Sequence, residues 1–173
     1  DNGTLLWEIT VAQPKGVTEI ERIADITSLP VVDGPLVYAV AYQGRIAAVD
    51  RATGRVVWNR EISSLNGLSA LDARLFVSHY LGSVYALDYA SGKTFWRQGA
   101  LKYRNLTGPV PMTNWVAVGD VEGYVHFLGR EDGAFNARLR LTDSPILPRM
   151  VLINSDTLLA QSVEGGIFAF QIK

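Results

Sequence analysis

The sequence of 173 residues contains no cysteine and only two histidines. Without thiols the chain has no disulfide framework, no thiolate metal site and no cysteine nucleophile. His79 and His126 are too few and too far apart in the sequence for the usual zinc ligand set. Neither sign of charge dominates, because 16 Lys and Arg are balanced by 17 Asp and Glu. Binding to a phosphate backbone needs a basic excess, so we expect no nucleic-acid partner.

Long apolar runs are also missing. No run approaches the roughly 20 residues that cross a bilayer as a helix. The chain starts with Asp1-Asn2-Gly3 and no signal peptide, so we expect either a cytosolic protein or a targeting segment that lies elsewhere. Hydrophobic residues still make up 48% and charged residues 19%, which is the composition of a globular chain. The length suits one domain or part of a larger one.

What the sequence does contain is a repeat with a period of about 40 residues. Copies of the motif Gly-x-x-x-Trp begin at Gly3, Gly54, Gly92 and Gly133, and the last copy ends in Ala137 in place of tryptophan. A second motif, led by glycine and rich in aliphatic residues, begins at Gly44, Gly82, Gly123 and Gly165. Short apolar stretches rich in β-branched or aromatic residues precede the second motif, which indicates a repeated set of strands.

Four short strands fit into each repeat. In the run from Val84 to Leu87 alternate residues face opposite sides, as in a β-strand, and the glycines supply the positive φ that tight hairpin turns need. Such repeats are typical of β-propeller blades. The sequence therefore predicts an all-β protein, a β-propeller of four-stranded antiparallel blades with about four blades in this chain. We expect each motif tryptophan on the outermost strand of its blade, packed against the neighbouring blade.

The predicted units form a single partial propeller over residues 1–173. They are an outer strand at 3–11, an inserted loop at 13–27, complete blades at about 30–63, 68–101 and 109–141, and an incomplete blade at 147–173. The single strand at the start complements the three strands expected in the last blade. Proteins avoid unpaired strand edges, and a propeller does so by closing its ring. We therefore expect the chain to be part of a larger ring.

Two closures would pair the first strand. It completes the last blade of the same chain, or it completes the last blade of a second copy and gives a ring of eight blades from two chains. In a ring of eight blades, neighbouring blades are related by half the rotation angle that a ring of four blades requires. Exchange of an identical element between two copies is also a low-cost route to dimers. We expect the isolated chain to form this dimer.

The repeats and the loop that interrupts them carry two resemblances. The pattern Gly-x-aliphatic-x-Ala-aliphatic-Asp followed by Gly-x-x-x-Trp resembles the pyrroloquinoline-quinone-type repeat of quinoprotein alcohol dehydrogenases. The runs at 16–32, 37–44, 47–50 and 118–126 resemble the BamB family of outer-membrane protein assembly factors, over the C-terminal half of that family and with the inserted loop included. This second resemblance implies that the chain is part of an eight-bladed ring.

The BamB resemblance also implies a non-enzymatic scaffold with no cofactor. Members of the family bind the periplasmic domains of the barrel protein BamA and assist the folding of nascent barrel proteins. They are held at the periplasmic face of the outer membrane by a lipidated cysteine that this sequence lacks. In the family, acidic residues of the inserted loop contact BamA; here Asp25 keeps the acid and Thr27 departs from it. We therefore expect the partner-binding residues to be Glu19, Ile20, Arg22, Asp25 and Thr27.

The alternative is a quinoprotein-like enzyme or a ligand-binding propeller. The quinoprotein enzymes share adjacent cysteines, a calcium site and a catalytic aspartate, whereas this sequence has no cysteine. Its acids are spread singly through turns such as those at Asp50 and Asp88, where the aspartate is expected to cap the turn. Asp120 and Glu122 are close enough to share a cation, but they lie in a turn that ends at Gly123. The sequence therefore predicts neither a catalytic set nor a metal site.

Overall fold

The computed structural model describes residues 2–12, 26–147 and 149–172. In this part of the chain the strands form four antiparallel sheets, and in each sheet the strands are paired in the order of the sequence. Blade 1 consists of β1 (Val31–Asp33), β2 (Leu36–Val40), β3 (Ile46–Asp50) and β4 (Val56–Arg60). Blade 2 consists of β5 (Leu68–Leu71), β6 (Arg74–Ser78), β7 (Val84–Asp88) and β8 (Thr94–Gln98).

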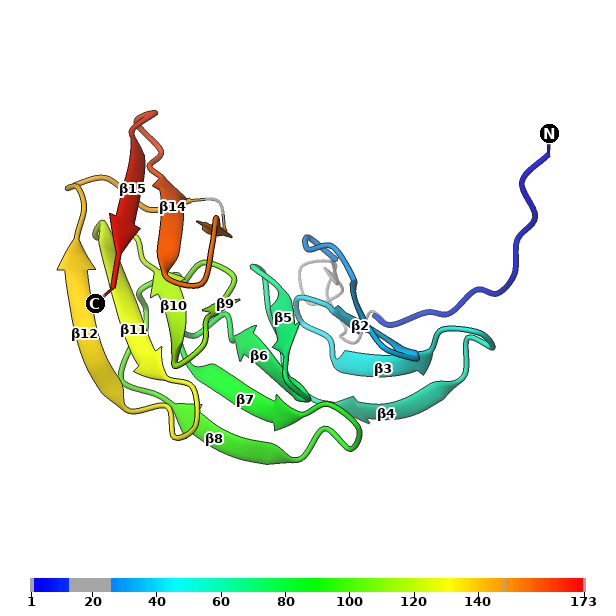
Figure 1. Cartoon of the computed structure of the whole chain (residues 1–173). Helices are drawn as coiled ribbons and strands as arrows, with labels where there is room; N and C mark the ends of the chain where they lie inside the picture. Colours follow the sequence, from blue (N-terminus) through cyan, green and yellow to red (C-terminus); the bar gives the residue numbers. More distant parts are fainter. Residues whose placement is uncertain (1, 13–25, 148, 173) are drawn as a thin grey trace, which may run out of the picture.

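The other two sheets continue the series. Blade 3 consists of β9 (Val110–Pro111), β10 (Trp115–Gly119), β11 (Tyr124–Gly129) and β12 (Phe135–Arg140). Blade 4 consists of β13 (Val151–Leu152), β14 (Thr157–Gln161) and β15 (Ile167–Gln171). Figure 1 shows the sheets side by side along an arc, with β4, β8 and β12 on its outer side. The predicted fold class, an all-β propeller of four-stranded antiparallel blades, is confirmed.

The hydrophobic core lies between neighbouring blades. Three clusters of buried side chains fill the successive interfaces, with Tyr38 and Leu75 in the first, Phe76 and Val116 in the second and Phe127 in the third. Because a central blade is covered on both faces, its middle strands are buried along almost their whole length, as in β6 and β10. Each blade is therefore stabilised mainly by its neighbours in the arc.

The motif tryptophans connect one blade to the next. Each indole N–H donates to a backbone carbonyl in a turn of the following blade: Trp7 to Arg51 (2.9 Å), Trp58 to Tyr89 (3.0 Å) and Trp96 to Arg130 (2.9 Å). Each ring lies against a glycine of that turn with positive φ, namely Gly54, Gly92 and Gly133. A Cβ atom on any of these glycines would lie within 2.8 Å of its tryptophan side chain. The predicted interblade packing of the motif tryptophans is confirmed.

The fourth copy of the motif has Ala137 in place of tryptophan, and its blade packs on the next blade through a different aromatic side chain. Cross-strand rows from the second, third and fourth strands read Tyr38–Ala48–Trp58, Phe76–Ala86–Trp96 and Ala117–Phe127–Ala137. Large and small side chains are thus exchanged in blade 3. The one aromatic ring in the blade 3 row is that of Phe127, and its centroid lies 6.3 Å from that of Phe170 in blade 4. The loss of tryptophan at Ala137 is offset by a phenylalanine on the neighbouring strand.

The turns between the third and fourth strands contain the predicted aspartate caps. In blade 1 the Asp50 carboxylate accepts a hydrogen bond from the backbone N–H of Thr53 (2.8 Å). In blade 2 the Asp88 carboxylate accepts one from the backbone N–H of Ser91 (2.7 Å). These contacts account for both acids as turn formers.

The outer strand predicted at 3–11 is not formed within this single chain. Residues 2–12 belong to no sheet among the described residues, so their backbone groups have no strand partner there. They are held by side chains instead: Trp7 packs on the turn at Gly54, and the Arg45 guanidinium donates to the carbonyl of Val11 (3.1 Å). Of the inserted loop predicted at 13–27, residues 13–25 lie outside the described residues. The part of the chain that the structure describes contains no helix of the length and apolarity needed to cross a membrane.

Candidate functional site

A fully buried carboxylate joins blade 3 to the segment that precedes it. Asp120 follows β10 and is 0% exposed. One of its oxygens, Oδ1, accepts hydrogen bonds from the backbone N–H groups of Glu122 (2.9 Å) and Tyr124 (3.0 Å). The other, Oδ2, accepts from the Arg104 guanidinium (2.5 Å) and lies 2.8 Å from Nε2 of His126. This carboxylate therefore has four partners from the turn, the adjacent strand and the interblade segment, the full set that a buried charge requires.

The charges around Asp120 compensate one another. Burial alone raises the pKa of the Asp120 carboxyl, but hydrogen bonds from His126, the backbone of Tyr124 and Arg104 outweigh it, so the pKa lies below its ordinary value. The hydrogen bond to Asp120 raises the pKa of Arg104. Arg104 also contacts the Glu122 carboxylate, at 3.1 Å. The guanidinium thus occupies the position between the two acids where a shared cation would bind.

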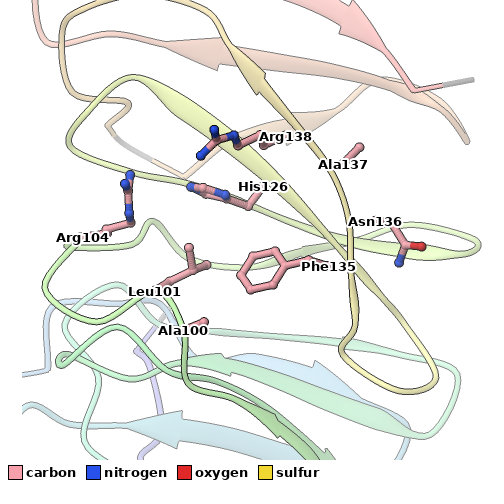
Figure 2. Close-up of a pocket in the computed structure, with 8 residues that line it drawn as sticks. All are labelled: Ala100, Leu101, Arg104, His126, Phe135, Asn136, Ala137 and Arg138. Atoms are coloured by element: carbon pink, nitrogen blue, oxygen red, sulfur yellow. The ribbon is translucent and has the colours of Figure 1, made fainter.

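A pocket of about 420 Å³ opens next to this network. One wall is the segment from Ala100 to Arg104, the opposite wall is the outer strand β12 from Phe135 to Arg138, and His126 lies between them (Figure 2). The lining is mixed. Leu101, Phe135 and the two alanines are apolar, Asn136 is polar and uncharged, and Arg104, His126 and Arg138 are basic. The pocket is therefore shaped for a ligand with an apolar body and a negative charge.

Neither histidine belongs to a nucleophilic set among the described residues. The side-chain partner of His126 is Asp120, and no serine, threonine or tyrosine hydroxyl in these residues hydrogen-bonds to its ring. The Nδ1 atom of His79 accepts a hydrogen bond from the backbone N–H of Leu81 (3.1 Å). Within the same residues, no group of three His, Asp or Glu side chains is placed to hold a metal ion. Both histidines therefore have local partners, Asp120 for His126 and the backbone of Leu81 for His79.

A second hollow, of about 480 Å³, lies where loops from successive blades meet. It is lined by residues 27–31, 65–68, 107–108, Leu147 and Arg149. The hydroxyl of Thr27 donates to the carbonyl of Leu65, which ties the segment before blade 1 to the segment before blade 2. Leu29 is 86% exposed beside it. The result is an open, partly apolar surface to which several blades contribute.

One predicted site residue is found on this surface. Thr27 lies in the hollow, whereas Glu19, Ile20, Arg22 and Asp25 lie outside the described residues. Sequence reasoning missed the network around Asp120. The acids Asp120 and Glu122 were visible as a pair, but the arginine that joins them, Arg104, is separated from Asp120 by β9, β10 and the loops that flank them.

The repeated four-stranded blades, their tryptophan contacts and the ligand-sized hollows between them define a β-propeller of the pyrroloquinoline-quinone repeat type whose described surfaces are suited to recognition. A family model described as outer membrane protein assembly factor BamB matches residues 1–98 and 80–173. The chain therefore belongs to the BamB family.

Individual relatives agree with this assignment. The chain is 38% identical over 170 residues to outer membrane protein assembly factor BamB of Yersinia pestis, which covers 98% of this chain and 43% of the relative. The crystal structure of BamB from Moraxella catarrhalis superimposes with a TM-score of 0.89 at 34% identity, over 96% of this chain and 49% of that one. The chain thus spans less than half the length of these relatives.

A more distant likeness concerns the fold alone. The quinohemoprotein alcohol dehydrogenase from Comamonas testosteroni superimposes with a TM-score of 0.56 at 22% identity, over 66% of this chain and 21% of that enzyme. The shared feature is the propeller blade.

Proposed function

We propose that this chain acts as a non-enzymatic scaffold in the machinery that assembles β-barrel proteins in the outer membrane. The observation that carries the proposal is the match to BamB proteins along nearly the whole chain, in sequence and in fold. The site of action is the periplasmic face of the outer membrane, and attachment is through a lipid anchor carried outside these residues. No cofactor takes part.

The partner is the periplasmic part of BamA, and nascent barrel proteins are the clients. Contact with BamA is made by Glu19, Ile20, Arg22, Asp25 and Thr27. Two features of the described residues support this placement. Thr27 lies in a hollow formed by loops of several blades, and the exposed Leu29 next to it offers an apolar anchor.

Charge reversal at the inserted loop tests this contact. In the double variant Arg22→Glu, Asp25→Arg, binding to BamA periplasmic domains is expected to weaken by about 1–2 kcal/mol, or roughly tenfold in Kd, because charges at the rim of an interface mostly set rate and register. Isothermal titration of the protein with these domains measures the change.

Lys93→Glu provides the matched control for that variant. Lys93 is exposed in the turn between β7 and β8, at the opposite end of the blades from Thr27. The Lys93→Glu variant should bind BamA periplasmic domains with the same affinity as the unaltered protein. Equal affinity of the double variant and the Lys93→Glu control would refute the assignment of the contact to this loop.

For the isolated chain we propose a dimer. Among the described residues, the outer edge of β15 has no strand beside it, and residues 2–12 are paired in no sheet. Residues 4–11 of a second copy would complete blade 4, and the exchange is reciprocal. Light scattering is expected to give twice the chain mass of 19.0 kDa. A protein that is folded by circular dichroism and has the single-chain mass at working concentrations would contradict the exchange.

A further inference from the structure

We infer that the pocket between residues 100–104 and β12 binds a carboxylate group carried on an aromatic or branched aliphatic body. The pocket is separate from Thr27 and from the hollow around it. Its volume of about 420 Å³ falls in the range of small-ligand sites. The inference concerns a second recognition site and does not depend on the BamA contact.

The charge of the pocket lining is the first argument. Arg104, His126 and Arg138 line the pocket, and no acidic side chain does. His126 and Arg138 are directly opposite each other on β11 and β12, so both side chains project from the same face of the sheet. Figure 2 shows the His126 ring with Arg104 and Arg138 around it. An anion that enters the pocket therefore meets basic groups from two blade elements and from the segment between blades.

Arg138 is the cation that remains available. Three guanidinium groups lie over the ring of Tyr124, those of Arg104 (5.8 Å), Arg138 (5.2 Å) and Arg140 (5.4 Å). Arg104 is paired with Asp120 and Glu122, and Arg140 is paired with Asp143. In the described part of the chain, Arg138 has no carboxylate partner. A planar guanidinium held against an aromatic ring is well placed to take a carboxylate through two parallel hydrogen bonds.

The apolar wall specifies the body of the ligand. Phe135 lines the pocket and is 45% exposed. Its ring packs edge-on against the His126 ring, with the ring centroids 6.1 Å apart. Leu101 and Ala100 complete this wall. Covering the exposed face of Phe135 with an apolar group removes its surface from water, while the charge of the ligand stays next to Arg138. Acetate alone fills only the charged half of the pocket.

Titration with N-acetylphenylalanine, followed by two-dimensional amide NMR of the protein, tests the inference. We expect saturable shifts centred on residues 100–104 and 135–138. N-acetylphenylalaninamide lacks the charge and acetate lacks the apolar body, so each should bind at least fivefold more weakly. A second arm with a peptide amide that contains adjacent Phe and Glu distinguishes an acidic side chain from a terminal carboxylate as the natural source.

Two variants on one strand complete the test. Arg138→Gln should weaken binding of N-acetylphenylalanine at least fivefold. Arg140→Gln, two residues along the same strand and over the same tyrosine, should bind within twofold of the unaltered protein, because Arg140 already has a carboxylate partner. Both side chains lie on an exposed strand, so the fold is retained. Equal binding of the carboxylate and its amide, or an unchanged affinity in Arg138→Gln, would overturn the inference.

Discussion

Replacement of Trp96 by alanine is expected to lower the free energy of unfolding by about 3–5 kcal/mol, the usual cost of deleting a large buried aromatic side chain. Trp96 is 8% exposed, packs on the turn at Gly133 and lies 6.1 Å from the ring of Phe76. Its indole N–H is bonded to the carbonyl of Arg130 in the next blade. The variant thus loses packing within blade 2 and the contact to blade 3 together. Equilibrium unfolding in urea measures the difference.

Phe95→Ala is the control for this change. Phe95 is the neighbouring residue on β8 and is 50% exposed, with the Arg74 guanidinium over its ring at 5.0 Å. Its removal should cost no more than about 1 kcal/mol. If Trp96→Ala were no more destabilising than Phe95→Ala, the tryptophan contacts would not be what joins the blades.

Replacement of Asp120 by alanine is expected to cost about 3–5 kcal/mol at neutral pH, because it takes the acceptor away from the buried His126 and from two backbone N–H groups and leaves Arg104 with Glu122 as its carboxylate partner. Arg104 and His126 lose their shared acceptor, and the backbone N–H groups of Glu122 and Tyr124 lose theirs. The control is Asp143→Ala. Asp143 pairs with Arg140 on the surface with its side chain 86% exposed, and such pairs contribute about 0–1 kcal/mol.

The pH dependence of the destabilisation caused by Asp120→Ala gives an independent check. The folded state lowers the pKa of Asp120 below its unfolded value. Its contribution is therefore fully present above the ordinary carboxyl pKa of about 4 and is lost as the pH falls through the lowered folded value. The difference in unfolding free energy between the unaltered protein and Asp120→Ala should therefore shrink as the pH falls from about 4 through the lowered folded pKa of Asp120. A difference that stays unchanged as Asp120 is protonated would contradict the network.

The repeat made the blades predictable from sequence, because each turn needs glycine and each motif tryptophan needs a neighbouring turn. The exchange of large and small residues in blade 3 was not predictable in the same way. The loss of tryptophan at Ala137 was visible, but its compensation by Phe127 depends on which residues face each other across the sheet. The outer strand predicted at 3–11 is absent from the single chain for a related reason, since a strand pattern forms a strand only where a partner edge lies beside it.

The two candidate sites also differ in how far the sequence predicts them. The contact residues in the inserted loop follow from family resemblance, and of these Thr27 is described, on a surface shared by several blades. The pocket beside β12 has no sequence signature, because its walls come from three separate segments. Arg104 and Asp120 illustrate the point: each has an ordinary local context, and their ion pair exists only because blade packing brings the interblade segment onto the turn.

The most direct test of the central claim is the affinity of the protein for purified periplasmic domains of BamA. The scaffold account predicts saturable binding that weakens as salt is raised, since charged loop residues take part, and no turnover of alcohols with a quinone cofactor. A folded protein that shows no binding to these domains, and that oxidises an alcohol when supplied with pyrroloquinoline quinone, would contradict the account.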